Sequence, residues 1–174
     1  MQALQSGDTF PKTTVSRLGG GTLVLGEPSG GRDWQMVVVY RGLHCPLCKK
    51  YLTQLEALKE RFHAAGIDLV AVSGDPEDKA RAFVDEVGLS VPVGYGLTTD
   101  QMRTLGVYIS SPRSPGETDR PFPEPGVFVV NDQGNLHIVD ISNAPFSRPD
   151  LEALAGGLEF IRANDYPIRG TYAA

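Results

Sequence analysis

Short continuous runs of apolar residues alternate with stretches in which apolar residues recur every three or four positions. The runs 36–40 and 67–73 are rich in β-branched residues, which predicts two buried strands. Between them, apolar side chains recur at helical spacing from Leu47 to Phe62, which predicts a helix over about 46–65 that Gly66 ends. This order of strand, helix and strand predicts a βαβ unit with parallel strands.

The next fifty or so residues contain weaker patterns. Asp75 followed by Pro76 is typical of a helix start, and we expect Asp75 to cap a helix that runs to about residue 87. The run 91–96 contains a proline, which predicts a poor strand towards an edge of the sheet. A short helix is expected over 99–105. The segment 109–125 holds five prolines and is expected to be a long loop, which is either functional or a plain surface excursion.

Two hairpins and one helix complete the pattern. Three glycines separate β-prone segments at about 13–18 and 22–25, which predicts an N-terminal hairpin. A second hairpin is predicted from 126–130 and 135–141, joined by a turn with glycine in the left-handed position. Leucines at helical spacing predict a last helix over about 151–163.

Length and charge restrict the classes of protein. The chain has 174 residues, enough for the single domain that we expect over 1–174. No apolar run approaches the ~20 residues of a membrane span, and the first residues show no secretory signal, so we expect a cytoplasmic protein. The formal net charge is −5 without a basic cluster, which disfavours nucleic acid and anionic membranes as partners.

The chemistry is expected at Cys45 and Cys48, the only cysteines, which lie where the strand 36–40 meets the following helix. The first turn of a helix favours a thiolate over a thiol, because its N–H groups are unpaired and the dipole is positive there. We therefore expect Cys45 to be the more exposed, nucleophilic thiol, and Cys48 to resolve its mixed disulfide. Further positive charge could come from Arg41, Lys49 and Lys50.

The cysteines and the residues around them have alternative roles. Two buried structural cysteines are disfavoured by the C-x-x-C spacing at this junction. A zinc site with His44 or His63 is disfavoured because no second ligand pair exists, so no metal or other cofactor is expected. His44 either tunes the Cys45 thiol or is a plain loop residue. Trp34 is expected to anchor packing, and His137 to lie on the solvated face of its strand.

The order of elements, with C-x-x-C at the first strand–helix junction, resembles the thioredoxin fold. The segment Gly7-Asp8-x-x-Pro11 and the Val-Phe-Val-Val-Asn-Asp-x-Gly run at 127–134 are similar, more narrowly, to the peroxiredoxin-like alkyl hydroperoxide reductase/thiol-specific antioxidant branch, over about 4–163. The resemblance implies an α/β thioredoxin-like fold, in which helices flank a central mixed β-sheet preceded by an N-terminal hairpin. It implies a disulfide or hydroperoxide substrate and a thioredoxin- or glutathione-like thiol donor, and it leaves a homodimer open.

The sequence departs from that family at two positions. Peroxiredoxins carry Pro-x-x-x-Thr-x-x-Cys here, and aligning Cys48 with the last cysteine puts Arg41 in place of the proline and Cys45 in place of the threonine. The family's arginine near the second hairpin is replaced by Pro125, which instead resembles the cis-proline that thioredoxins place opposite their cysteine pair. We therefore expect a cis Glu124–Pro125 bond and a thiol–disulfide oxidoreductase. The alternatives are a thiol peroxidase using Cys48 or Cys45, and a redox-inert binding module.

Overall fold

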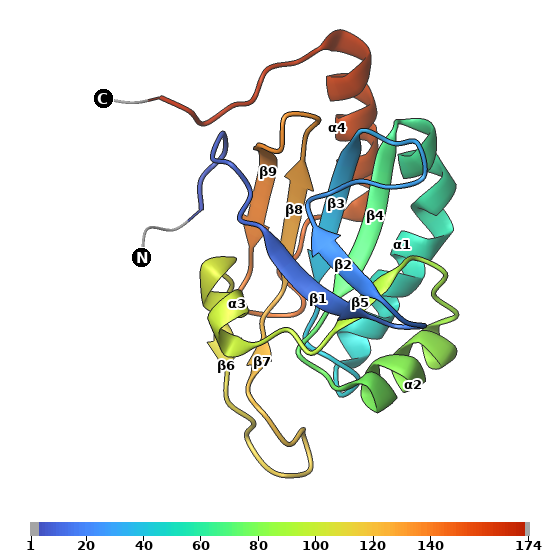
Figure 1. Ribbon diagram of the computed structural model, residues 1–174, viewed down its shortest axis with the longest axis vertical. Helices are drawn as coiled ribbons and strands as arrows, with labels where there is room; N and C mark the ends of the chain where they lie inside the picture. Colours follow the sequence, from blue (N-terminus) through green and yellow to red (C-terminus); the bar gives the residue numbers. More distant parts are fainter. Residues whose placement is uncertain (1–3, 173–174) are drawn as a thin grey trace.

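The computed structural model describes residues 4–172 and contains a seven-stranded sheet in the order β2-β1-β5-β4-β3-β8-β9 (Figure 1). The strands of this sheet are β1 (Thr13–Arg17), β2 (Thr22–Leu25), β3 (Trp34–Val39), β4 (Ile67–Val72), β5 (Val93–Tyr95), β8 (Gly126–Val130) and β9 (Leu136–Ile141). A separate two-stranded ribbon consists of β6 (Ile109–Ser110) and β7 (Phe122–Pro123). The helices are α1 (Pro46–Ala64), α2 (Glu77–Val87), α3 (Thr99–Thr104) and α4 (Leu151–Asn164).

The sheet is mixed. β3, β4 and β5 run parallel to one another, with Val38 opposite Ala71, whereas β8 pairs antiparallel with both β3 and β9. The predicted βαβ unit is therefore confirmed as β3–α1–β4. The expected hairpins β1–β2 and β8–β9 are also confirmed, with bounds within a residue or two of the prediction.

Both faces of β3 are covered. Met36, Val38 and Tyr40 pack in a core under α1, α2 and α4, while Val37 and Val39 pack in a second core with residues of α3 and of the N-terminal segment (Figure 1). All six residues of the strand are buried as a result. This explains why the sequence of β3 is a continuous apolar run instead of an alternating one.

The position predicted for β5 is wrong. β5 lies inside the sheet, because the hairpin β1–β2 adds to it through the pairs Ser16–Tyr95 and Arg17–Gly94. Pro92 precedes the strand, so its missing N–H removes no ladder bond, and its carbonyl accepts a hydrogen bond from the Ala71 N–H (3.0 Å). The proline therefore does not require an edge position.

Asp75 and His137 also differ from expectation. α2 begins at Glu77 without a side-chain cap, and Asp75 is buried before it. His137 is buried with its ring 4.7 Å from the ring of Trp34, which packs as expected. A register shift between β8 and β9 interrupts the inward–outward alternation at His137, since Val129 pairs with Ile138 and Val130 with Leu136.

The segment 109–125 is less irregular than predicted. Its two ends pair as the β6–β7 ribbon, and the Glu124 N–H donates to the Tyr108 carbonyl (2.7 Å). The residues between them extend from the end of the sheet nearest α2 and α3 (Figure 1). No helix within residues 4–172 combines the length and apolar character that crossing a membrane requires.

Candidate redox site

A tight turn connects β3 to α1. The Tyr40 N–H still donates to the Val72 carbonyl (3.0 Å), and Cys45 is the residue that caps α1, with Pro46 at the first helical position. The Cys45 Sγ accepts a hydrogen bond from the Cys48 N–H (3.1 Å). A sulfur therefore occupies the place that an oxygen usually takes at a helix N-terminus.

Cys45 and Cys48 form a disulfide, with their Cα atoms 5.2 Å apart. The predicted pairing is confirmed. The accessible thiol expected at Cys45 is not found in this oxidised form, because both residues are buried: Cys45 is 1% exposed and Cys48 is 0% exposed. Both belong to the core cluster beneath α1, together with Tyr40 and Leu52. A reaction partner therefore needs a local movement to reach either sulfur.

Asp75 holds the turn before Cys45. Its Oδ2 accepts a hydrogen bond from the Leu43 N–H (2.7 Å), and burial raises the pKa of its carboxyl. Gly42 lies against the same carboxylate with φ 136°, and a Cβ at this position would lie 2.7 Å from the Asp75 Oδ1. Only glycine fits both the backbone conformation and this close approach.

Arg148, in the segment between β9 and α4, is the cation at the disulfide. One of its terminal nitrogens donates to the Cys48 Sγ (3.3 Å), and its Nε donates to the Pro145 carbonyl (2.9 Å). Burial lowers the pKa of the Arg148 guanidinium to about 10, so it is still charged at pH 7. Sequence reasoning missed this residue, because it lies 100 positions from Cys48 and follows no motif at the cysteines.

Two of the three cations expected near the cysteines, Arg41 and Lys49, are paired with carboxylates instead. The Arg41 guanidinium lies 3.3 Å from Glu124 and 3.9 Å from Glu117, and its face covers the ring of Phe122. Lys49 pairs with Glu86 on α2 (2.8 Å). Much of their charge is therefore compensated away from the sulfurs.

The cis bond expected at Glu124–Pro125 is absent, since every peptide bond within residues 4–172 is trans. The neighbouring backbone explains this. Glu124 is bonded to the ribbon through its N–H, and the Pro125 carbonyl accepts from the Ser142 N–H (3.0 Å). The chain therefore passes through Pro125 from the ribbon into β8 in an extended path, and the comparison with the thioredoxin cis-proline fails.

His44 lies between the turn and the long segment. Its ring contacts the edge of Phe122 (4.5 Å between centroids), and both ring nitrogens are buried without a hydrogen-bond partner among the described residues. Burial, with a contribution from the Arg41 charge, lowers the pKa of the imidazole, so it is neutral at pH 7. The geometry gives His44 a covering position next to Cys45.

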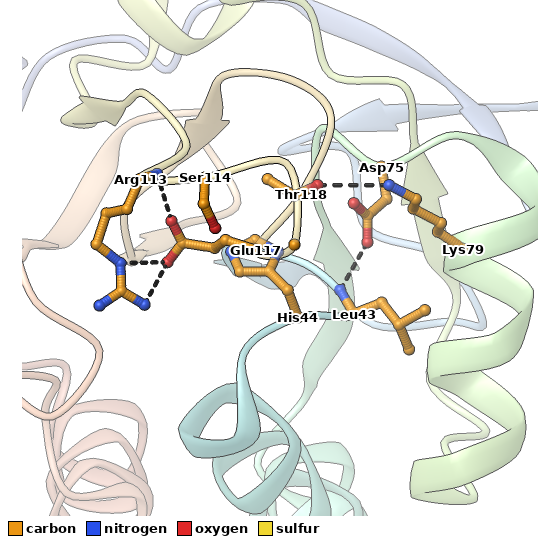
Figure 2. A pocket seen from close by; sticks show the side chains of 9 residues that line it. Leu43, His44, Asp75, Lys79, Arg113, Ser114, Glu117 and Thr118 are labelled. Carbon is orange, nitrogen blue, oxygen red and sulfur yellow. Dashed lines mark hydrogen bonds and ion pairs between the residues drawn. The ribbon is translucent and has the colours of Figure 1, made fainter.

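A polar pocket of about 680 Å³ lies beside this turn (Figure 2). Its walls carry charges of both signs, with Arg113 bonded to Glu117 and Lys79 bonded to Thr118, while Asp75 binds the Leu43 N–H. Neither cysteine lines the pocket. A smaller groove of about 220 Å³ lies beside α1, and its lining residues include Leu47, Tyr51, Phe146 and Arg148.

Within residues 4–172, no group of three or more His, Cys, Asp and Glu side chains is arranged to hold a metal ion.

Comparison with known proteins decides the family. The family model described as AhpC/TSA matches residues 6–139. The chain belongs to the AhpC/TSA family. The relationship expected from the sequence is thus confirmed for this AhpC/TSA protein, and its fold agrees with that of solved peroxiredoxins.

Three solved structures illustrate the fold. A Cys-to-Ser mutant of peroxiredoxin 6 from Arenicola marina is 16% identical, with a TM-score of 0.79 over 94% of this chain and 76% of that one. A peroxiredoxin-like protein from Aquifex aeolicus is 17% identical, with a TM-score of 0.75 over 92% and 90%. AhpC of Mycobacterium bovis is 15% identical, with a TM-score of 0.74 over 99% and 100%.

A curated relative is similar over a short stretch. The thiol-disulfide oxidoreductase ResA of Halalkalibacterium halodurans is 34% identical to this AhpC/TSA protein over 53 residues. The match covers 30% of each chain, so it spans less than a third of the relative's length.

The Gly42–Asp75 contact can be tested by substitution. We expect Gly42→Ala to lower the free energy of unfolding of the oxidised protein by about 2 kcal/mol or more, because it combines backbone strain with a clash against a buried carboxylate. Urea denaturation measures the loss. Gly19→Ala is the control, since Gly19 also has a positive φ (90°) but no atom within 4 Å of the added Cβ. Equal losses in the two variants would contradict a specific role for the Asp75 contact.

Proposed function

We propose that residues 1–174 form a single-domain, peroxiredoxin-like thiol–disulfide oxidoreductase whose working group is the Cys45–Cys48 pair. The observation that carries this proposal is the disulfide between these residues at the N-terminus of α1, within an AhpC/TSA fold. The name of the curated relative supports the same class of reaction.

In the reduced protein, Cys45 is the nucleophile. Its thiolate is stabilised by the Cys48 N–H and by the positive end of the α1 dipole. It attacks a substrate disulfide, and the S–S bond of the substrate breaks to release one thiolate. Cys48 then attacks the Cys45 sulfur of the mixed disulfide and releases the second substrate thiolate, so two electrons pass to the substrate.

The return reaction uses the same atoms. A donor thiolate attacks the Cys45 Sγ, and Cys48 leaves as a thiolate beside the Arg148 guanidinium. A second donor thiol completes the donor disulfide. The thiols carry both electrons, so no cofactor is required.

We propose that the protein works in the cytoplasm and that a thioredoxin- or glutathione-like thiol is its electron donor.

Arg41 and His44 cover the turn before Cys45 in this proposal. Glu124 holds Arg41, Phe122 contacts His44, and Pro125 supports the start of β8 through its bond to Ser142. A homodimer is compatible with this proposal, which assigns both thiols to one chain.

Hydroperoxide reduction is a second candidate, and the Arg148–Cys48 contact favours it. A Cys48 thiolate would attack the peroxide oxygen, giving a sulfenic acid and water or an alcohol, and Cys45 would then displace water to form the disulfide. A guanidinium beside the sulfur stabilises the thiolate that this reaction needs. The chain lacks the family's threonine and arginine, however, so disulfide exchange is the function that we propose first.

Trapping separates the roles of the two cysteines. We expect Cys48→Ser to accumulate a mixed disulfide at Cys45 with a substrate disulfide, because the resolving thiol is missing. Cys45→Ser should trap little. Mass spectrometry identifies the adducts of the two variants. In the wild-type protein, a glutathione redox titration should show a reversible loss of two hydrogens as the Cys45–Cys48 disulfide forms. If both thiols stayed free after treatment with diamide, the proposed oxidoreductase function would be contradicted. The redox-inert binding module would then be the favoured function.

Peroxide provides the second test. In Cys45→Ser, we expect slow formation of sulfenic acid at Cys48 with hydrogen peroxide, and about tenfold slower formation when Arg148 is also replaced by Ala, because the thiolate fraction falls. Stopped-flow with a sulfenic-acid probe measures the rate. Arg81→Ala is the control for a change in net charge, since Arg81 is exposed and pairs with Glu77. Fast oxidation of Cys48 that depends on Arg148 would make peroxide reduction the main function.

A further inference from the structure

Arg148 is a partly buried cation that has no carboxylate partner among the described residues. It forms no ion pair within residues 4–172, and one terminal nitrogen is buried without a hydrogen-bond partner there. Its polar contacts are the Pro145 carbonyl and the Cys48 Sγ. A charge that is desolvated in this way interacts strongly with any anion that forms next to it.

The ring of Tyr51 supports the face of this guanidinium. The Arg148 Cζ lies 4.4 Å from the Tyr51 ring centroid, and Tyr51 is 8% exposed. Its hydroxyl donates to the Pro149 carbonyl (2.9 Å), which fixes the backbone next to Arg148. Burial raises the pKa of the Tyr51 phenol, so this hydroxyl keeps its proton across the neutral range.

Tyr51 and Cys48 are three residues apart on α1, so their side chains project from one face of the helix. The helix thus presents the sulfur and the aromatic platform together, and Arg148 lies across both. A cation–π contact of this kind has its largest effect when the cation is desolvated.

We propose that Tyr51 is a positioning residue that holds Arg148 beside Cys48 and thereby shifts the redox equilibrium of the Cys45–Cys48 pair towards the dithiol. This inference rests on the proposed function. When a donor thiolate attacks Cys45, the Cys45–Cys48 bond breaks and its electron pair leaves on the Cys48 sulfur. The guanidinium held by Tyr51 receives that negative charge, which makes Cys48 a better leaving group and stabilises the reduced form.

The experiment measures the equilibrium constant of the reaction of the protein disulfide with two glutathione molecules, which gives the dithiol and glutathione disulfide. We expect Tyr51→Leu to lower this constant about three- to tenfold at pH 7, because the ring no longer holds the cation. Tyr51→Phe keeps the ring and should stay within about twofold of wild type. Arg148→Ala should lower the constant at least as much as Tyr51→Leu.

A double-mutant cycle distinguishes positioning from a purely structural role. If Tyr51 acts through Arg148, Tyr51→Leu has no further effect on the constant in the Arg148→Ala background. Phe62→Leu is the matched control, since Phe62 is a buried aromatic residue about 16 Å further along α1. It should lower stability without changing the constant.

A second readout is the rate of Cys48 alkylation as a function of pH in the Cys45→Ser background. The midpoint pH of this profile should rise when Tyr51→Leu is added and should return to its original value with Tyr51→Phe. This inference is overturned if Tyr51→Leu leaves the equilibrium constant unchanged, or if it changes the constant equally with Arg148 present and in the Arg148→Ala background. Neither result would contradict the proposed oxidoreductase function. A wild-type pair that does not cycle with glutathione would instead overturn the proposed function.

Discussion

The architecture depends on the packing of the junction between β3 and α1, which buries both cysteines. β3 is covered by a core on each face, and the helix that follows it begins with a sulfur as its cap. Two contacts hold the turn between them: Gly42 lies against the Asp75 carboxylate, and this carboxylate binds the Leu43 N–H. This constraint fixes both cysteines relative to the helix dipole and to Arg148.

The distribution of charge follows from this arrangement. Arg41 precedes the cysteines in sequence, yet Glu117 and Glu124 of the long segment take up its charge. Arg148 comes from the other end of the chain and lies at Cys48 without a carboxylate partner in the described part of the protein. Proximity in sequence is therefore a poor guide to which cation acts on a thiol. What counts is how far the cation is buried and whether a carboxylate already pairs with it.

The sequence predicted the features that depend on residues close together in the chain. β3, α1, the hairpins and the cysteine pair follow from apolar periodicity and from C-x-x-C at a strand–helix junction, and the structure confirms them. Contacts between distant segments were not predictable. The burial of His137 depends on a bulge, the place of β5 depends on a hairpin seventy to eighty residues earlier, and Asp75 binds a turn instead of capping α2. The trans Pro125 shows how a motif borrowed from thioredoxins fails when its neighbours are bonded differently.

The short spacing of the disulfide has a consequence for stability. Cross-linking two residues that are three positions apart closes a very small loop, so it removes far less entropy from the unfolded chain than a bridge between distant segments would. By this relation the covalent bond adds less to stability than a bridge between distant segments would, and most of the apolar burial lies in the two cores on the faces of the sheet. A bond that contributes modestly to stability suits the proposed function, in which it is broken and re-formed in each cycle.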